Sequence, residues 1–142
     1  PDTTEPVLNI THLATGVAAV HSLGGTGRGV LVAVIDTGVD YTHPALGRCF
    51  GPACLVAFGR DFAGDSFQGD GDTPQPKDDP MDWQLMLSPP RTHSDGHGTH
   101  VAGILAANDS RVLGVSPGIK LGAYKIFGCT GGTTSDLIIK AM

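Results

Sequence analysis

The chain has 142 residues, which is enough for one domain with a buried core. Its composition is 40% hydrophobic and 16% charged with 21 glycines, which is typical of a globular protein and not of a disordered one. The formal net charge of −5 argues against a nucleic-acid-binding surface, and no apolar run is long enough to span a membrane.

A short helix and a glycine-rich turn are the first predicted elements. Thr11 can cap the helix, and the pair Gly24-Gly25 is expected to end it. Its apolar residues recur at helical spacing: Leu13, Val17 and Val20. The glycine cluster at 25–29 precedes a predicted strand, whereas the glycine fingerprint of a dinucleotide site must follow one. The cluster is therefore interpreted as a flexible turn and not as a nucleotide site.

The first predicted strand is the continuous apolar run at 30–35. It is rich in β-branched residues, a pattern typical of a parallel strand that is covered on both faces. Asp36 follows the run, at the end where parallel α/β sheets carry their functional groups. A buried carboxylate is costly without a partner, so we expect Asp36 to have one. The alternative is a turn-forming aspartate in Asp36-Thr37-Gly38.

The later elements alternate between strands and helices. Further strands are expected from Leu55 into Phe62 and from Lys120 to Phe127, and a helix rich in Ala and Gly begins at His97. Thr133 or Ser135 can cap a last helix that runs to the end of the chain. This alternation predicts a single α/β domain with a three-layer parallel sheet.

Pro, Gly and Asp dominate the loop at 64–93. Its carboxylates raise the possibility of a calcium site, although their spacing fits no loop with a known coordination pattern. These residues are Asp65, Asp70, Asp72, Asp78, Asp79 and Asp82. A solvated acidic loop is the alternative, and no metal site is assigned.

The three cysteines are an odd number. Cys49 and Cys54 are close enough in sequence to form a local disulfide, which would leave Cys129 over, but buried thiols are the alternative. Two glycosylation sequons, at 9–11 and 108–110, also favour secretion. Together these features predict an extracellular protein.

His97 is the strongest candidate for a catalytic base. It lies between two glycines, which permit a substrate and the neighbouring backbone to approach closely. A nearby carboxylate could hold its ring in the tautomer of a general base, and Asp36 is the candidate for that carboxylate. The spacing of His93, His97 and His100 also raises a zinc site. However, the glutamate of the zinc-protease helix is missing, so no metal is expected there.

These segments resemble two motifs of the subtilisin-like serine proteases. Residues 32–40 resemble the aspartate motif of that family, residues 97–103 resemble its histidine motif, and Asp precedes His as in the family. Residues 40–46 and 79–82 are most similar to the minor-extracellular-protease group.

The resemblance implies a subtilisin-like three-layer α/β fold and a serine endopeptidase that acts on proteins or peptides. Asp36 would orient His97, and His97 would take a proton from a serine hydroxyl. Gly131 and Gly132 would pair with the substrate backbone as an added strand, and Phe127 would lie near the small subsites. We expect a secreted monomer without a cofactor, a nucleic-acid partner or a membrane partner.

The chain departs from the family pattern in two places. The family's nucleophile motif and oxyanion asparagine lie further downstream, and no serine of this chain has that context. We therefore expect 1–142 to be the N-terminal part of a catalytic domain, inactive and marginally folded by itself. The segment Trp83 to Ser94 is interpreted as an insertion before the histidine motif.

Two alternatives to a working serine protease stay open. One is an inert subtilase-like binding fold. The other is an aspartic protease that uses Asp36-Thr37-Gly38, which would need a second copy of that triplet.

Overall fold

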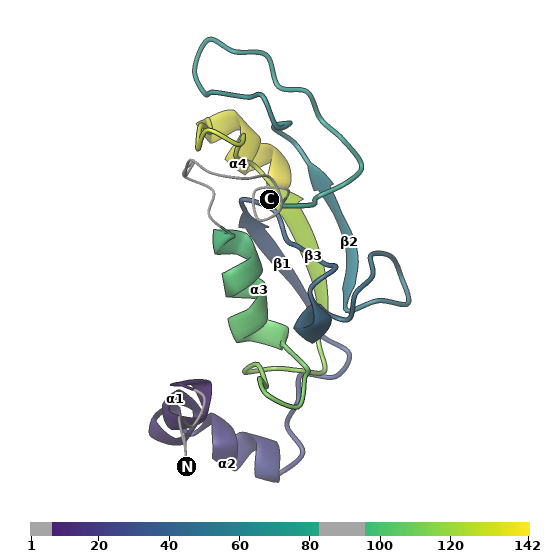
Figure 1. Cartoon of the computed structure of the whole chain (residues 1–142), viewed down its shortest axis with the longest axis vertical. Helices are drawn as coiled ribbons and strands as arrows, with labels where there is room; N and C mark the ends of the chain where they lie inside the picture. The colour runs from purple at the N-terminus through teal and green to yellow at the C-terminus, as the bar shows by residue number, and fades with distance from the viewer. Residues whose placement is uncertain (1–6, 83–95) are drawn as a thin grey trace.

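Three parallel strands form the sheet in the computed structural model, which describes residues 7–82 and 96–142. The strand order is β1 (Leu31–Asp36), β3 (Lys120–Lys125), β2 (Val56–Asp61), so the last strand in sequence is the central one (Figure 1). Asp36 of β1 and Asp61 of β2 both pair in register with Lys125 of β3. The three strands therefore end at one level. The segment Trp83 to Ser94 lies outside the described residues.

Helices lie on both faces of the sheet. Helix α3 (His97–Ala106) packs against β1 and β3, where Ala102 and Ala106 meet the side chains that point to that face. The opposite face of the strands packs against α4 (Ser135–Ala141), chiefly through Leu137. Small residues in α3 let the helix lie close to the sheet. The predicted α/β fold with a parallel sheet between helices is confirmed.

Strand β1 is less buried than the sequence predicts. Val34 is 5% exposed, but Leu31 is 66% exposed and Val30, just before the strand, is 50% exposed. Within the described residues β1 lies at an edge of the sheet and pairs with β3 on one side. The expectation of a strand covered on both faces is therefore wrong for the first residues of β1.

The N-terminal helix predicted from Thr11 is also wrong in its bounds. Two helices are present, α1 (Val7–Thr15) and α2 (Val17–Ser22), and Thr11 lies inside the first. Gly16 separates them because it adopts a left-handed conformation, with φ of 81°, that a helix cannot continue through. None of the described helices is long and apolar enough to cross a membrane.

The last helix begins differently from the prediction. The sequence favours Thr133 or Ser135 as its cap, whereas Thr134 occupies that position. Thr133 donates its hydroxyl hydrogen to the carbonyl of Ile126 at 2.6 Å. Thr133 thus ties the start of α4 to the chain just after β3. A short 3-10 helix, η1 (Pro44–Leu46), completes the regular elements.

The cysteine alternatives are decided in favour of the disulfide. Cys49 and Cys54 are bridged, and their Cα atoms are 5.7 Å apart. The bridge closes the turn between η1 and β2. Cys129 is half-buried in the segment that follows β3.

Candidate active site

The two predicted catalytic side chains meet at the carboxyl end of the sheet. Asp36 is the last residue of β1, and His97 is the first residue of α3. The Nδ1 atom of His97 lies 2.8 Å from Oδ1 and 2.9 Å from Oδ2 of Asp36. The backbone N–H of Thr37 also donates to Oδ1, at 2.7 Å. The carboxylate side chain is 15% exposed and the imidazole 67% exposed, so the pair opens to solvent on the histidine side.

This contact fixes the tautomer of the imidazole. An ionised carboxylate only accepts hydrogen bonds, so Nδ1 of His97 must carry the hydrogen. In the neutral ring the Nε2 atom then has a lone pair, on the side away from Asp36. The arrangement can take up a proton at Nε2 and stabilise the resulting imidazolium, which is what a general base requires.

Thr37 and Gly98 hold the helix against the strand. A Cβ atom at Gly98 would lie 2.1 Å from the carbonyl oxygen of Gly38, so any side chain there would push α3 away from β1. The N–H of Gly98 donates to Oγ1 of Thr37 at 3.0 Å. This bond satisfies one of the N–H groups that a helix start leaves without an intrahelical partner.

The same threonine hydroxyl reaches a second carboxylate. Thr37 donates from Oγ1 to Oδ2 of Asp82 at 3.1 Å, and Asp82 is 1% exposed. The sequence interpretation assigned neither residue this role. The position of Thr37 directly after Asp36 is a local signal for a turn. Its hydrogen bond to Asp82 joins residues 45 positions apart, and no local pattern indicates such a contact.

A cavity of about 240 Å³ opens beside the pair. Its lining consists of Asp36, Thr37, His97, Phe127 and Gly131. Phe127 and Gly131, which the resemblance assigns to substrate binding, thus contact the same space as the two catalytic candidates. Gly132 is not in this lining; its carbonyl accepts a hydrogen bond from the N–H of Gly128 at 3.0 Å.

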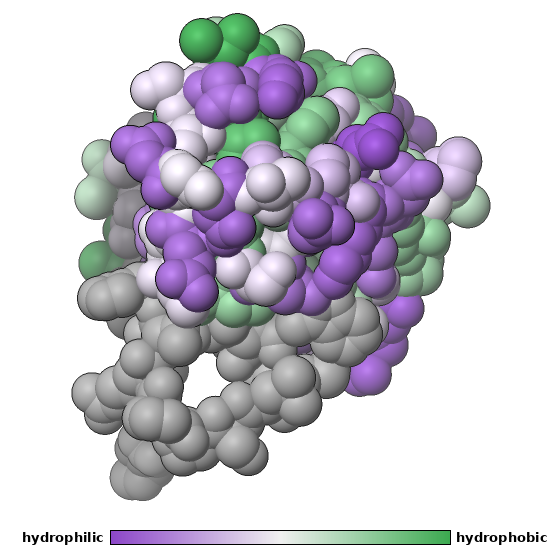
Figure 2. All heavy atoms as spheres, turned by 90° about the horizontal axis from the view of Figure 1, so that it is seen from above, coloured by the Kyte–Doolittle hydropathy of each residue, from purple (hydrophilic) through white to green (hydrophobic). Residues whose placement is uncertain are grey.

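Polar residues cover much of this end of the molecule. Figure 2 views it from the end at which the strands terminate, and hydrophilic residues predominate over the centre of the described face.

Asp79 accepts a hydrogen bond from the hydroxyl of Tyr41 at 3.0 Å. Burial and this hydrogen bond raise the pKa of Tyr41 to about 12.

In the described part of the acidic loop, carboxylates accept hydrogen bonds from backbone N–H groups and from lysine side chains. Asp72 accepts the N–H groups of Gln68 and Thr73, and Asp65 pairs with two lysines. Within residues 7–82 and 96–142, no group of three or more His, Cys, Asp and Glu side chains could hold a metal ion.

Comparison with known proteins decides the family. The model of the subtilase family matches residues 27–142. The chain belongs to the subtilase family. The chain is 36% identical over 138 residues to the minor extracellular protease Vpr of Bacillus subtilis, which covers 97% of the chain and 15% of that protein. It is 36% identical over 128 residues to subtilisin amylosacchariticus of Bacillus subtilis subsp. amylosacchariticus, covering 87% of the chain and 26% of the relative.

A third relative, the major intracellular serine protease of Bacillus subtilis, is 31% identical over 138 residues, covering 92% of the chain and 36% of the relative. The chain thus spans 15% to 36% of the length of these three relatives. The chain is thus assigned to the subtilases, and the third relative is named as a serine protease. This family assignment does not support an aspartic protease. The geometry does not support one either, because both carboxylate oxygens of Asp36 face the histidine ring and not a second carboxyl group.

Proposed function

We propose that the protein containing this chain is a serine endopeptidase in which Asp36 and His97 are two members of an Asp-His-Ser triad. The observation that carries the proposal is the contact of His97 Nδ1 with the Asp36 carboxylate at 2.8 Å. Family membership supports the same chemistry. Among the described residues no serine lines the cavity beside the pair, so the proposal assigns the nucleophile to another part of the protein.

The proposed reaction uses the Nε2 atom of His97 twice, first as a base and then as an acid. Nε2 takes the proton from the serine hydroxyl as the serine oxygen attacks the scissile carbonyl, and the imidazolium then gives that proton to the leaving amine. Asp36 keeps Nδ1 protonated and stabilises the positive ring. Water then attacks the acyl-enzyme with the same base and releases the acid product.

The proposed substrates are proteins and peptides. Gly131 and Gly132 would pair with the substrate backbone as an added strand, a mode in which main-chain hydrogen bonds supply affinity. Phe127 would offer an apolar contact for a substrate side chain. Support comes from Phe127 and Gly131, which line the cavity beside His97.

The proposed location is extracellular, and the proposed enzyme is a monomer without a cofactor or a nucleic-acid partner. The disulfide between Cys49 and Cys54 supports an oxidising compartment. One relative is named as an extracellular protease, in line with this proposal, and another is named as an intracellular one.

Peptide hydrolysis by the full-length protein tests the proposal. We expect inhibition by a serine-directed phosphonate and none by pepstatin, the reagent for aspartic proteases. We expect His97→Ala to lower kcat by about a million-fold, because the general base that activates the serine is lost. His100→Ala is the matched control, since His100 lies one turn along the same helix and is exposed. Unchanged hydrolysis by His97→Ala would refute the assignment.

Two further outcomes separate the alternatives. Residues 1–142 alone are expected to hydrolyse no peptide, because the described cavity holds no serine. A full-length protein that binds peptides but does not hydrolyse them would favour the inert binding fold.

A further inference from the structure

A buried lysine ends the central strand of the sheet. Lys125 is 2% exposed, and its Nζ atom donates to Oδ2 of Asp61 and to Oδ1 of Asp65, both at 2.8 Å. In register, Lys125 lies between Asp36 of β1 and Asp61 of β2. The lysine thus joins the strand beside the catalytic carboxylate to the loop that follows β2.

Four charged side chains close the base of that loop. Lys77 pairs with the second oxygen of the Asp65 carboxylate, and its backbone exchanges two hydrogen bonds with Asp61, each of 2.9 Å. The two positive charges of the lysines therefore balance the two negative charges of the aspartates. An unpaired buried ion would be costly. The residues between them, 62–76, form a loop whose two ends are held together.

The charges of Lys125 and Asp65 are stabilised by each other. Burial lowers the pKa of Lys125, but its hydrogen bonds with Asp61 and Asp65 outweigh burial and raise the pKa above the usual value. Burial raises the pKa of Asp65, but its hydrogen bonds with Lys125 and Lys77 outweigh burial and lower it. Lys125 and Asp65 therefore both stay charged at neutral pH.

The loop is bonded to the segment that lines the cavity. The backbone N–H of Cys129 donates to the carbonyl oxygen of Asp65 at 2.8 Å. Next to it, the hydroxyl of Thr130 donates to the carbonyl oxygen of Phe67 at 3.4 Å. Asp65 thus binds the lysine through its side chain and the segment at 128–132, which we call the wall segment, through its main chain.

Two glycines bring the loop and the wall segment into direct backbone contact. A Cβ atom at Gly128 would lie 1.8 Å from the carbonyl oxygen of Phe67, and one at Gly132 would lie 2.2 Å from that of Gln68. No side chain fits between the two backbones at either point. The position of the wall segment therefore depends on the position of residues 65–69.

We propose that Asp65 is a positioning residue for extended peptide substrates: by binding Lys125 and Cys129 it sets the place of the wall segment. This inference rests on the proposed function, since Gly131 of the wall segment shares the cavity with His97. An added strand needs its main-chain partners at the correct spacing along several residues. A small ester that reaches only the reacting atoms does not use those partners.

Asp65→Asn in the full-length protein tests the proposal. The substitution keeps the size of the side chain and the backbone carbonyl but removes the charge that both lysines bind. Asp70→Asn is the matched control, because Asp70 is an exposed carboxylate of the same loop and its loss changes the net charge equally. We expect Asp65→Asn to raise KM about fivefold for a peptide long enough to pair with the wall segment. Hydrolysis of a single-residue ester and kcat should not change.

Hydrogen exchange supplies a readout that does not need catalysis. The amides of residues 128–132 are expected to exchange faster in Asp65→Asn than in the wild type or Asp70→Asn. Equal KM values for the long peptide in both variants, with equal exchange, would overturn the proposal. So would a matching loss on the short ester, which would indicate general damage to the site. If the wild type hydrolyses neither substrate, the proposed function fails, whereas exchange still decides whether Asp65 positions the wall segment.

Discussion

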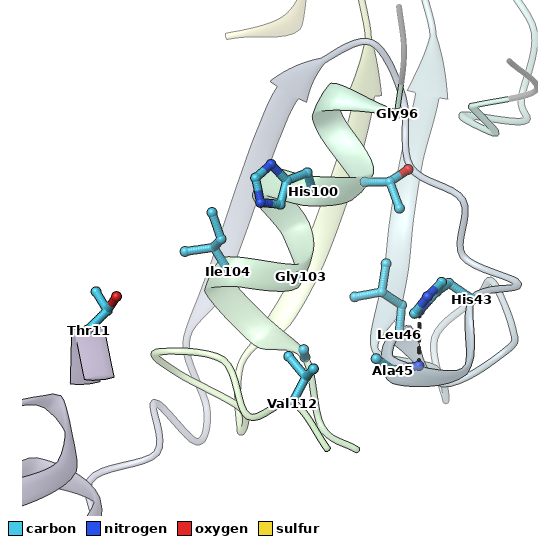
Figure 3. A pocket seen from close by; sticks show the side chains of 11 residues that line it. Thr11, His43, Ala45, Leu46, Gly96, His100, Gly103, Ile104 and Val112 are labelled. Carbon is cyan, nitrogen blue, oxygen red and sulfur yellow. Dashed lines mark hydrogen bonds between the residues drawn. The ribbon is translucent and has the colours of Figure 1, made fainter. Parts of the chain in front are cut away.

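Helix α3 has a cavity on each of two sides, and the two cavities differ in chemistry. The one beside Asp36 and His97 measures about 240 Å³, whereas the other measures about 600 Å³. Figure 3 shows the larger one, which we call the α3 groove, between α3, α1, η1 and the connection that carries Val112. Apolar and small side chains such as Leu46 and Ile104 supply most of its lining.

Two histidines also line the α3 groove. The contacts of one of them, His43, show why the volume of a cavity does not identify a reaction site. His43 uses its Nδ1 atom to accept the N–H of Ala45 at 3.2 Å, so this ring stabilises its own turn (Figure 3). His97 uses the same atom to contact a carboxylate. The smaller cavity therefore has the paired groups that acid–base chemistry needs, and the larger one has the surface of a packing site.

Of the substitutions that compare the two cavities, Asp36→Asn in the full-length protein should have the largest effect on activity, because Asp36 lines the smaller cavity. The amide would turn an N–H group toward Nδ1 and favour the tautomer in which Nε2 carries the hydrogen, so His97 could no longer accept a proton. We expect kcat/KM for a peptide substrate to fall by about 10,000-fold at neutral pH. The change in the free energy of unfolding, measured in urea, should be far smaller than the rise in activation free energy that this loss of kcat/KM represents. A loss of activity smaller than tenfold would contradict the role of Asp36.

Leu46→Ala tests the other side of α3. Leu46 is 1% exposed and belongs to the core cluster with Ala102 and Ala106 of the helix. We expect a loss of about 2–5 kcal/mol in the free energy of unfolding, because the truncation leaves a cavity in a packed core. At a temperature where the variant is fully folded, kcat/KM should stay within about twofold of the wild type. A folded variant without activity would show that the groove takes part in the reaction.

Local patterns carried the parts of this comparison that the sequence could predict. The apolar run at 30–35 followed by one carboxylate, and a histidine between glycines before a small-residue helix, are both local signals. They predicted β1, α3 and the meeting of Asp36 with His97. The helix break at Gly16 was missed, because a single glycine inside an amphipathic pattern does not by itself dictate a left-handed conformation.

Contacts between distant segments carried the parts that the sequence could not predict. Lys125 reaches Asp61 across 64 positions and Asp65 across 60, and Thr37 reaches Asp82 across 45. Such pairs depend on strand register and on the path of a loop, neither of which has a local pattern. The lysine itself was the available signal, since a charge in the apolar strand 120–127 needs a buried partner.

The pH dependence of stability gives the smallest and most specific test, since it reads the charges of the loop behind the smaller cavity. The pKa of Asp65 lies below its usual value of 3.8, because the hydrogen bonds with Lys125 and Lys77 outweigh burial. A lowered pKa means that the folded state binds its proton less readily than the unfolded state. The stabilisation by Asp65 is therefore present above pH 3.8 and is lost as the pH falls through the folded pKa.

We expect wild type and Asp65→Asn to differ by less than about 1 kcal/mol in free energy of unfolding, since this carboxylate is partly exposed. The difference should be constant at neutral pH and shrink below pH 3.8, as urea unfolding at a series of pH values would show. Asp70→Asn should show no such change. The raised pKa of Lys125 places the loss of its own contribution above its usual 10.5, so alkaline pH up to that value should leave the network intact. A difference that grows as the pH falls would mean that Asp65 is not the partner of these lysines in solution.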